Sequence, residues 1–122
     1  MAIIADYYLD LALAGINDGT RIDICSTEPI NFTQATVTYT LGNKTSLTVG
    51  APTDATPNGR KVVVPAITDG SVTANGTAGF WALSDVANSR LIAAKSLTAT
   101  QVVTSGNVFT LDAIDITLPD AV

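Results

Sequence analysis

The chain has 122 residues, of which 47% are hydrophobic and only 14% are charged. This balance predicts a folded chain and argues against a disordered one, and the length suits one domain with one core. The formal charge is -5, and the six basic residues are scattered along the chain. We therefore expect no nucleic-acid partner, because binding a phosphate backbone needs clustered positive charge.

The sequence also argues against a membrane partner and against secretion by the general route. It has no run of about 18 apolar residues, and it does not begin with a cationic stretch followed by an apolar segment and a small-residue cleavage site. Its single cysteine, Cys25, cannot form a disulfide within the chain. We expect a cytosolic product that is held together by burial and backbone hydrogen bonds.

The first predicted element is a helix over Ile3 to Ala14, ended by Gly15. Ile4, Tyr8 and Leu11 fall on one stripe of this helix. A helix of this length is marginal alone, so the stripe is expected to dock on another surface. Two hypotheses stay open, in which the helix covers its own β core or docks on a neighbouring subunit.

Strands are predicted from residue 20 onward. The segment Thr20 to Cys25 alternates, with Ile22 and Ile24 on one side and Arg21, Asp23 and Cys25 on the other, which indicates a half-buried strand. A loop is expected over Ser26 to Gln34, a strand over Ala35 to Leu41 and a short strand over Lys44 to Val49. The longest predicted loop covers Gly50 to Gly59, which contains Pro52 and Pro57.

The second half of the chain predicts further hairpins. Strands are expected over Arg60 to Ile67 and over Ser71 to Thr77, joined by a tight turn at Thr68-Asp69-Gly70. A second hairpin pairs Phe80 to Asp85 with Arg90 to Ser96. The last strand candidates are Gln101 to Val103, Asn107 to Leu111 and Ala113 to Leu118.

Short strands separated by turns at this spacing are typical of antiparallel sheets. The chain also contains 18 threonines, which suit half-exposed strand faces, and a single glutamate, Glu28, which leaves little material for exposed helices. We predict a mainly β protein, an antiparallel β-sandwich (jelly-roll or Ig-like) of about eight short strands. It is expected to form one domain over 1–122, with the N-terminal helix in 1–15 and the β core in 20–118.

The residues available for chemistry indicate a protein without catalysis, cofactor or metal. The chain has no histidine, so neither a Ser-His-Asp triad nor a histidine metal site can be assembled. Catalysis would need a carboxylate pair, and the candidates are Asp112 with Asp115 and Asp18 with Asp23. Spacing of three residues places the first pair on opposite faces of a strand, so we interpret these aspartates as turn or edge residues. No calcium-loop motif is present.

The remaining candidates are contact residues. Phe80 and Trp81 are adjacent, so a regular strand directs one ring to each face. We expect one ring in the core and the other against the N-terminal helix or a neighbouring subunit, with a sugar platform as the less favoured alternative. The predicted interaction residues are Ile4, Tyr8, Leu11, Trp81, Pro52 and Pro57.

Four segments carry a resemblance to known proteins: Asp18-Gly-Thr-Arg-Ile-Asp-Ile-Cys-Ser26, Gly79-Phe-Trp-Ala-Leu-Ser-Asp85, Leu91-Ile-Ala-Ala94 and Val102-Val-Thr-Ser-Gly-Asn-Val-Phe-Thr-Leu111. In this order, after an N-terminal helix, they resemble small virion proteins of tailed bacteriophages and prophages. Head decoration or cement proteins of that group are similar in size and β content, while tail-tube, collar and fibre-associated domains remain open. The motifs are strand-and-turn patterns, so no site residues are carried over.

The resemblance implies a structural virion protein that forms a homo-oligomer and binds the major capsid protein or other virion proteins. A subunit of this kind buries weakly charged surface against many neighbours, where symmetry multiplies modest contacts. Three other readings stay open: a tail- or fibre-associated module that binds a receptor or carbohydrate, a host adhesin or pilin-like subunit, and an enzyme.

Overall fold

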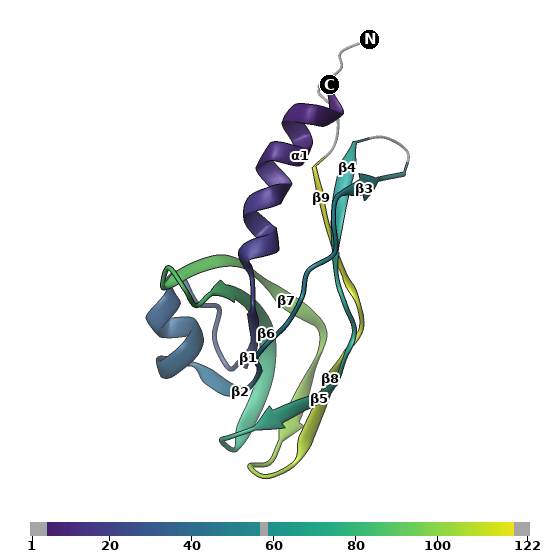
Figure 1. The fold of residues 1–122 in the computed structure, drawn as a ribbon. Helices are drawn as coiled ribbons and strands as arrows, with labels where there is room; N and C mark the ends of the chain where they lie inside the picture. The colour runs from purple at the N-terminus through teal and green to yellow at the C-terminus, as the bar shows by residue number, and fades with distance from the viewer. Residues whose placement is uncertain (1–4, 57–58, 119–122) are drawn as a thin grey trace.

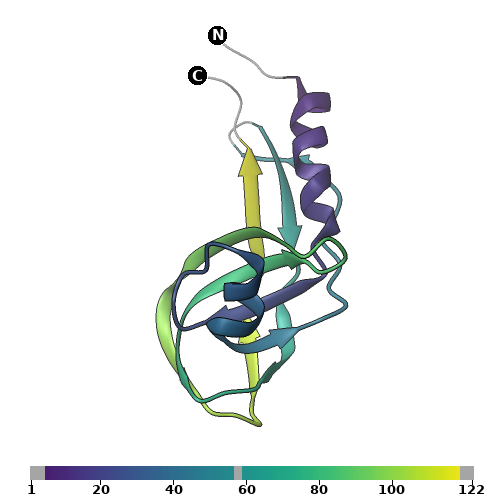
Figure 2. The same cartoon turned by 90° about the vertical axis from the view of Figure 1, so that its left-hand side faces the viewer.

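The computed structural model describes residues 5–56 and 59–118. It contains a short N-terminal helix and antiparallel sheets, so the predicted mainly β class is confirmed. The predicted sandwich takes the form of a curled six-stranded sheet with the order β7-β6-β1-β2-β5-β8 and a three-stranded sheet with the order β3-β4-β9 (Figures 1 and 2). The strands are β1 Arg21–Cys25, β2 Thr40–Lys44, β3 Thr53–Asp54, β4 Arg60–Val64, β5 Ile67–Val72, β6 Gly76–Asp85, β7 Arg90–Val103, β8 Val108–Leu111 and β9 Ile114–Leu118.

The helix α1 (Asp6–Ala14) stands beside the three-stranded sheet, above the curled sheet in Figure 1. It ends at Ala14 as predicted, and a 3-10 turn η1 (Gly15–Asp18) leads into β1. Leu9 and Leu13 form its buried side, and Asp10 accepts hydrogen bonds from Arg60 of β4 (Nε to Oδ1, 2.8 Å). The hypothesis that the stripe with Tyr8 and Leu11 covers the chain's own β core was therefore wrong, because both residues are exposed and Leu9 and Leu13 are buried instead. The hypothesis that the stripe docks on a neighbouring subunit stays a prediction.

Strand β1 lies in the middle of the curled sheet, between β2 and β6. Ile22 and Ile24 are buried in the main core, as predicted. The opposite face is also covered, because Cys25 packs with Ala35 and Ala82 in a second buried cluster. The prediction of a half-buried strand was therefore wrong, since a segment distant in sequence covers the second face.

That covering segment was predicted to be a strand over Ala35 to Leu41, and this was wrong: residues Gln34–Thr38 form a π-helical turn, η2. Side chains favour the turn by bonding to nearby backbone. The Gln34 N–H donates to Asn31 Oδ1 (2.8 Å), and the Ile30 N–H donates to Gln34 Oε1 (2.9 Å). Asn31 and Gln34 thus have the three-residue spacing of a helix-starting cap, which outweighs the β preference of the threonines.

Three further boundaries differ from prediction. The segment Lys44 to Val49 is not a strand beyond β2, and Ser46 has a positive φ of 56°. The predicted loop over Gly50 to Gly59 contains the two-residue strand β3. The predicted turn at Thr68-Asp69-Gly70 lies inside β5. Strands β4 and β5 belong to different sheets, because Pro65 lies between them and lacks an N–H for pairing.

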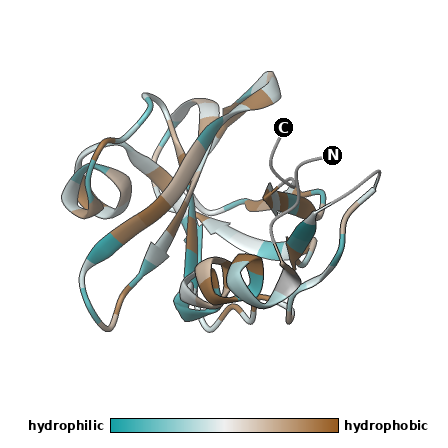
Figure 3. Ribbon diagram, turned by 90° about the horizontal axis from the view of Figure 1, so that it is seen from above, coloured by the Kyte–Doolittle hydropathy of each residue, from teal (hydrophilic) through white to brown (hydrophobic). Residues whose placement is uncertain are grey.

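The predicted hairpin across Val86 to Ser89 is confirmed: β6 and β7 pair in antiparallel register from Asp85↔Arg90 onward. The final strand β9 also forms where predicted and pairs with β4. The main core lies inside the curled sheet and extends to β4 and β9 of the smaller sheet. Figure 3 shows the hydrophobic positions on α1 and along the strands that supply it.

Gly70 shows why one strand position requires glycine. A Cβ atom there would lie 2.3 Å from Cζ of Phe109, on the neighbouring strand β8. The missing side chain therefore lets the Phe109 ring lie flat against β5 and fill the core.

Candidate interaction surface

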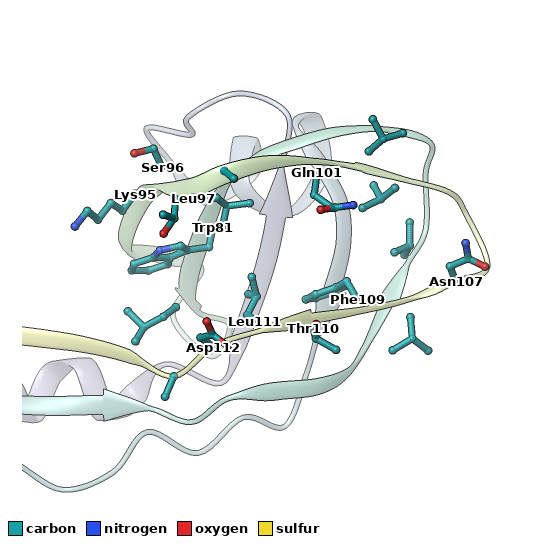
Figure 4. A pocket seen from close by; sticks show the side chains of 18 of the residues that line it. Trp81, Lys95, Ser96, Leu97, Gln101, Asn107, Phe109, Thr110, Leu111 and Asp112 are labelled. Atoms are coloured by element: carbon teal, nitrogen blue, oxygen red, sulfur yellow. The ribbon is translucent and has the colours of Figure 1, made fainter.

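A cleft of about 900 Å³ opens between β7 and β8, the two edge strands of the six-stranded sheet. The curl of the sheet brings these edges to face one another without pairing. Figure 4 shows Leu97 and Gln101 directed from β7 toward β8, with Phe109 and Leu111 rising from β8 into the gap. We call this surface the β7–β8 cleft, defined by Leu97, Gln101, Val102, Val108 and Phe109, with Trp81 of β6 beneath them.

The β7 wall of the cleft separates from its neighbour β6. The register passes from Ala78↔Gln101 directly to Phe80↔Ser96, so Leu97 to Thr100 have no partner residue in β6. Only Gly79 lies opposite these four residues. This bulge bends β7 and leaves a stretch of its backbone without a pairing strand on the side of β6.

One end of the β7–β8 cleft is closed by the connection between the two strands. Ser105 donates its N–H to Asn75 Oδ1 (2.7 Å), and the Gly106 N–H donates to the Val72 carbonyl (2.9 Å). Gly106 has a φ of +93°, which a glycine adopts without strain. This connection is therefore anchored to β5 and to the residues that follow it, and the cleft has a fixed end.

The lining is apolar at depth, and its charged residues are Lys95, Asp112 and Asp115. Lys95 and Asp112 lie at the end of the cleft away from Asn107 (Figure 4). Trp81 and Phe109 are buried beneath it, whereas Val102 and Val108 at the rim are 73% and 66% exposed. No charged residue lies between Lys95 and Asp112, a segment that contains the second half of β7 and all of β8. Apolar side chains exposed beside open strand edges are typical of a contact surface.

A second exposed apolar surface lies on α1. Tyr7, Tyr8 and Leu11 are 66%, 65% and 55% exposed, and the two tyrosine rings stack edge to face with centroids 5.2 Å apart. Two of these, Tyr8 and Leu11, are predicted interaction residues that the structure brings together on one face, and Tyr7 was missed. Ile4, predicted for the same stripe, lies outside the described residues.

The other predicted contact residues are not brought together. Trp81 faces the main core and the β7–β8 cleft, while Phe80 packs in the second cluster, so the two rings lie on opposite faces as predicted. Trp81 is 7% exposed and therefore presents no open ring to solvent. Pro52 is half-buried, and its carbonyl accepts a hydrogen bond from Arg60 Nη2 (3.3 Å), whereas Pro57 lies outside the described residues.

The aspartates considered for catalysis have other contacts. Asp23 is fully buried and accepts from Arg21 Nε (2.8 Å) and Nη2 (2.9 Å) and from Thr40 Oγ1 (2.7 Å), while Asp18 is exposed in η1. Hydrogen bonding to Asp23 raises the pKa of the Arg21 guanidinium. Asp115 pairs with Lys61 (3.1 Å) on the exposed side of β9. The Arg21–Asp23 ion pair lies within β1, whereas the Lys61–Asp115 ion pair joins β4 to β9.

Cys25 is a buried thiol. Burial, followed by the nearby Asp23 carboxylate, raises its pKa to about 12. The Sγ–H donates weakly to the Ala35 carbonyl (3.6 Å). Because the thiolate is the nucleophilic form, Cys25 in this setting is chemically inert near neutral pH.

Two features are absent from residues 5–56 and 59–118. Side chains of His, Cys, Asp and Glu nowhere gather in threes with metal-ligand geometry in this part of the chain. Nor do these residues form a helix with the length and hydrophobicity needed to cross a membrane.

The β7–β8 cleft residues were missed by the sequence analysis, apart from Trp81. A signal was present, because the residues between Lys95 and Asp112 lack charge and proline although they contain the second half of β7 and all of β8. Natural edge strands usually carry a charged residue or a proline, which protects them against pairing with another chain. The alternation alone could not show that these two strands lie at opposite edges of one sheet.

Comparisons of the chain with protein-family models, with curated proteins and with solved structures found no match in any of the three.

Proposed function

We propose that the protein is a non-enzymatic structural component of a tailed-phage virion, acting as a capsid decoration or cement subunit. One observation carries the proposal: exposed large apolar side chains occur in four separate regions of the described surface. They are Tyr7, Tyr8 and Leu11 on α1, Ile30 and Val37 at η2, Val86 in the turn between β6 and β7, and Val102 and Val108 at the β7–β8 cleft. Such surfaces favour a subunit with several protein neighbours over a monomer in solution.

The charge distribution supports the same proposal. Four of the six basic residues are already held by aspartates within the chain: Arg21, Lys44, Arg60 and Lys61. The surface therefore offers few unpaired basic groups, and packing the paired ones against neighbours costs less desolvation than burying a lone cation. In a symmetric shell, each modest contact is repeated by many copies.

Sedimentation with virion parts tests the proposal. The purified protein is mixed with capsids and, separately, with isolated tails of the phage that encodes it, and its ratio to the major capsid protein is measured in the pellet. Binding to capsids at a fixed ratio supports the decoration role. Binding only to tails overturns it in favour of the tail-associated receptor- or carbohydrate-binding alternative, and binding to neither overturns the virion assignment.

A matched pair of variants sharpens this test at α1. Leu11→Asp places a charge on the exposed apolar face, whereas Ala12→Asp adds the same charge at another exposed position of the same helix. If α1 contacts the shell, Leu11→Asp weakens capsid binding and Ala12→Asp does so less. If both variants bind capsids as tightly as the wild-type chain does, α1 is not part of the contact surface.

A further inference from the structure

We infer that the β7–β8 cleft binds an extended, uncharged segment of another protein as an added β-strand. Among residues 5–56 and 59–118, strand β7 has β6 as its only neighbour in the sheet, and β8 has only β5. Each edge therefore presents backbone N–H and C=O groups toward the cleft, as every unpaired sheet edge does. An extended polypeptide is the ligand whose backbone matches two such rows of donors and acceptors.

The geometry also sets how such a segment would run. All neighbouring strands in the curled sheet are antiparallel, so β7 and β8 run in opposite directions. An inserted strand is therefore parallel to one edge and antiparallel to the other. Leu97 to Thr100 have no partner in β6, so this part of β7 is the least constrained by its own sheet.

The composition of the edges specifies the chemistry of the segment. The interval between Lys95 and Asp112 has neither charge nor proline, the two features that usually block edge pairing. Beyond the charged lining residues Lys95, Asp112 and Asp115, a charged segment would lose hydration against Leu97 and Phe109 without gaining an opposite charge there. The fitting occupant therefore alternates small polar residues such as threonine with β-branched apolar residues, and directs the apolar ones toward Leu97 and Phe109.

The described part of the chain does not offer such a segment to a second copy. Each of its nine strands already has a hydrogen-bonded neighbour, whereas a strand between two edges must be unpaired on both sides. We therefore assign the donor to a different protein. That the donor is a shell protein rests on the proposed function, but recognition of an extended strand rests on the cleft alone.

The first experiment uses the peptide Lys-Thr-Val-Thr-Val-Thr-Val-Lys with blocked ends. Its six central residues are the uncharged segment, and its terminal lysines keep it soluble. Amide hydrogen exchange of the full chain is measured with and without it, over residues 97–103 and 108–111. At a peptide concentration tenfold above its Kd, exchange at the bound edges slows about tenfold, because exchange then proceeds through the free fraction. The peptide is also tested near 1 mM, where about half of the sites would be filled even at a Kd of about 1 mM. Unchanged exchange at both edges under this condition overturns the inference.

Two pairs of variants separate edge pairing from loss of folding. Ala99→Pro removes an N–H in the stretch without a β6 partner, and its control is Ala87→Pro, in the β6–β7 turn, where proline fits. Thr98→Lys places a charge on β7 in this stretch, and its control is Thr117→Lys on the exposed side of β9, outside the cleft. We expect peptide binding about tenfold weaker in the two cleft variants and unchanged in the controls. Equal weakening in cleft and control variants, or none, overturns the inference.

The same variants distinguish this inference from the proposed function. If particles bind the wild-type chain and both cleft variants equally, while the peptide is also ignored, the virion role stands and the cleft inference falls. If the peptide protects both edges but no virion part binds the chain, the cleft inference stands and the proposed function falls. Edge protection that rises with protein concentration in the absence of peptide overturns the foreign donor in favour of a second copy.

Discussion

Replacing Arg21 by leucine should be among the most destabilising single changes on the curled sheet. The Asp23 carboxylate is fully buried, and two of its three hydrogen bonds come from the Arg21 guanidinium. Arg21→Leu leaves the charge with Thr40 as its remaining donor. A buried carboxylate deprived of its cation is costly because water cannot replace the lost partner.

The magnitude follows from burial and geometry. Breaking a buried ion pair by removing one partner costs about 3–5 kcal/mol. The Arg21 side chain is 22% exposed, so some water reaches the pair, and we expect the lower end, about 3 kcal/mol. For a urea m-value of about 1.5 kcal/mol/M, the midpoint of unfolding falls by about 2 M.

Urea unfolding at 25 °C measures this loss, with two companion variants. Lys44→Met breaks an ion pair whose aspartate, Asp69, is 67% exposed, and should cost under about 1 kcal/mol. Replacing Arg21 and Asp23 together by leucine should recover most of the lost stability, because no unpaired charge remains. The reasoning is refuted if Arg21→Leu costs no more than Lys44→Met, or if the double variant is less stable than Arg21→Leu.

Three other predictions concern packing and the thiol. Gly70→Ala forces the Phe109 ring to move and should cost about 1–3 kcal/mol in thermal or urea unfolding, and a neutral result would contradict the close contact. Leu13→Ala should cost about 2–5 kcal/mol, since it opens a cavity beneath α1, with Ala12→Gly as a helix control. Cys25, with its pKa raised to about 12 from 9.0, should resist a thiol reagent at pH 8 until the protein unfolds. Because the unfolded thiol loses its proton first, the contribution of Cys25 to stability falls between about pH 9 and about pH 12.

Local sequence patterns were sufficient to predict an element where one local interaction dominated its formation. The Val86 to Ser89 turn and the strands beside it formed as predicted, because neighbouring segments with matching alternation pair across a short turn. Gly15 ended the helix where expected. Ile22 and Ile24 entered the core, since their period of two fits a strand with an apolar face.

Errors arose where a distant or side-chain contact decided the outcome. The β preference of the threonines in Ala35 to Leu41 was outweighed by the hydrogen bonds of Asn31 and Gln34, which start a turn of helix. That turn then covered Cys25, so β1 became buried on both faces. Of the two hypotheses for Tyr8 and Leu11, packing on the chain's own core failed, because Leu9 and Leu13 are the buried residues of α1.

The sequence by itself determined the mainly β class, the N-terminal helix and the scarcity of groups for catalysis, because composition and local alternation act over a few residues. Only the tertiary structure decided which strands became edges. The curl of the sheet placed β7 and β8 opposite one another and created the cleft between Leu97 and Phe109. Sheet order depends on pairings between residues far apart in the chain, such as Gly42 with Val72, which no local pattern encodes.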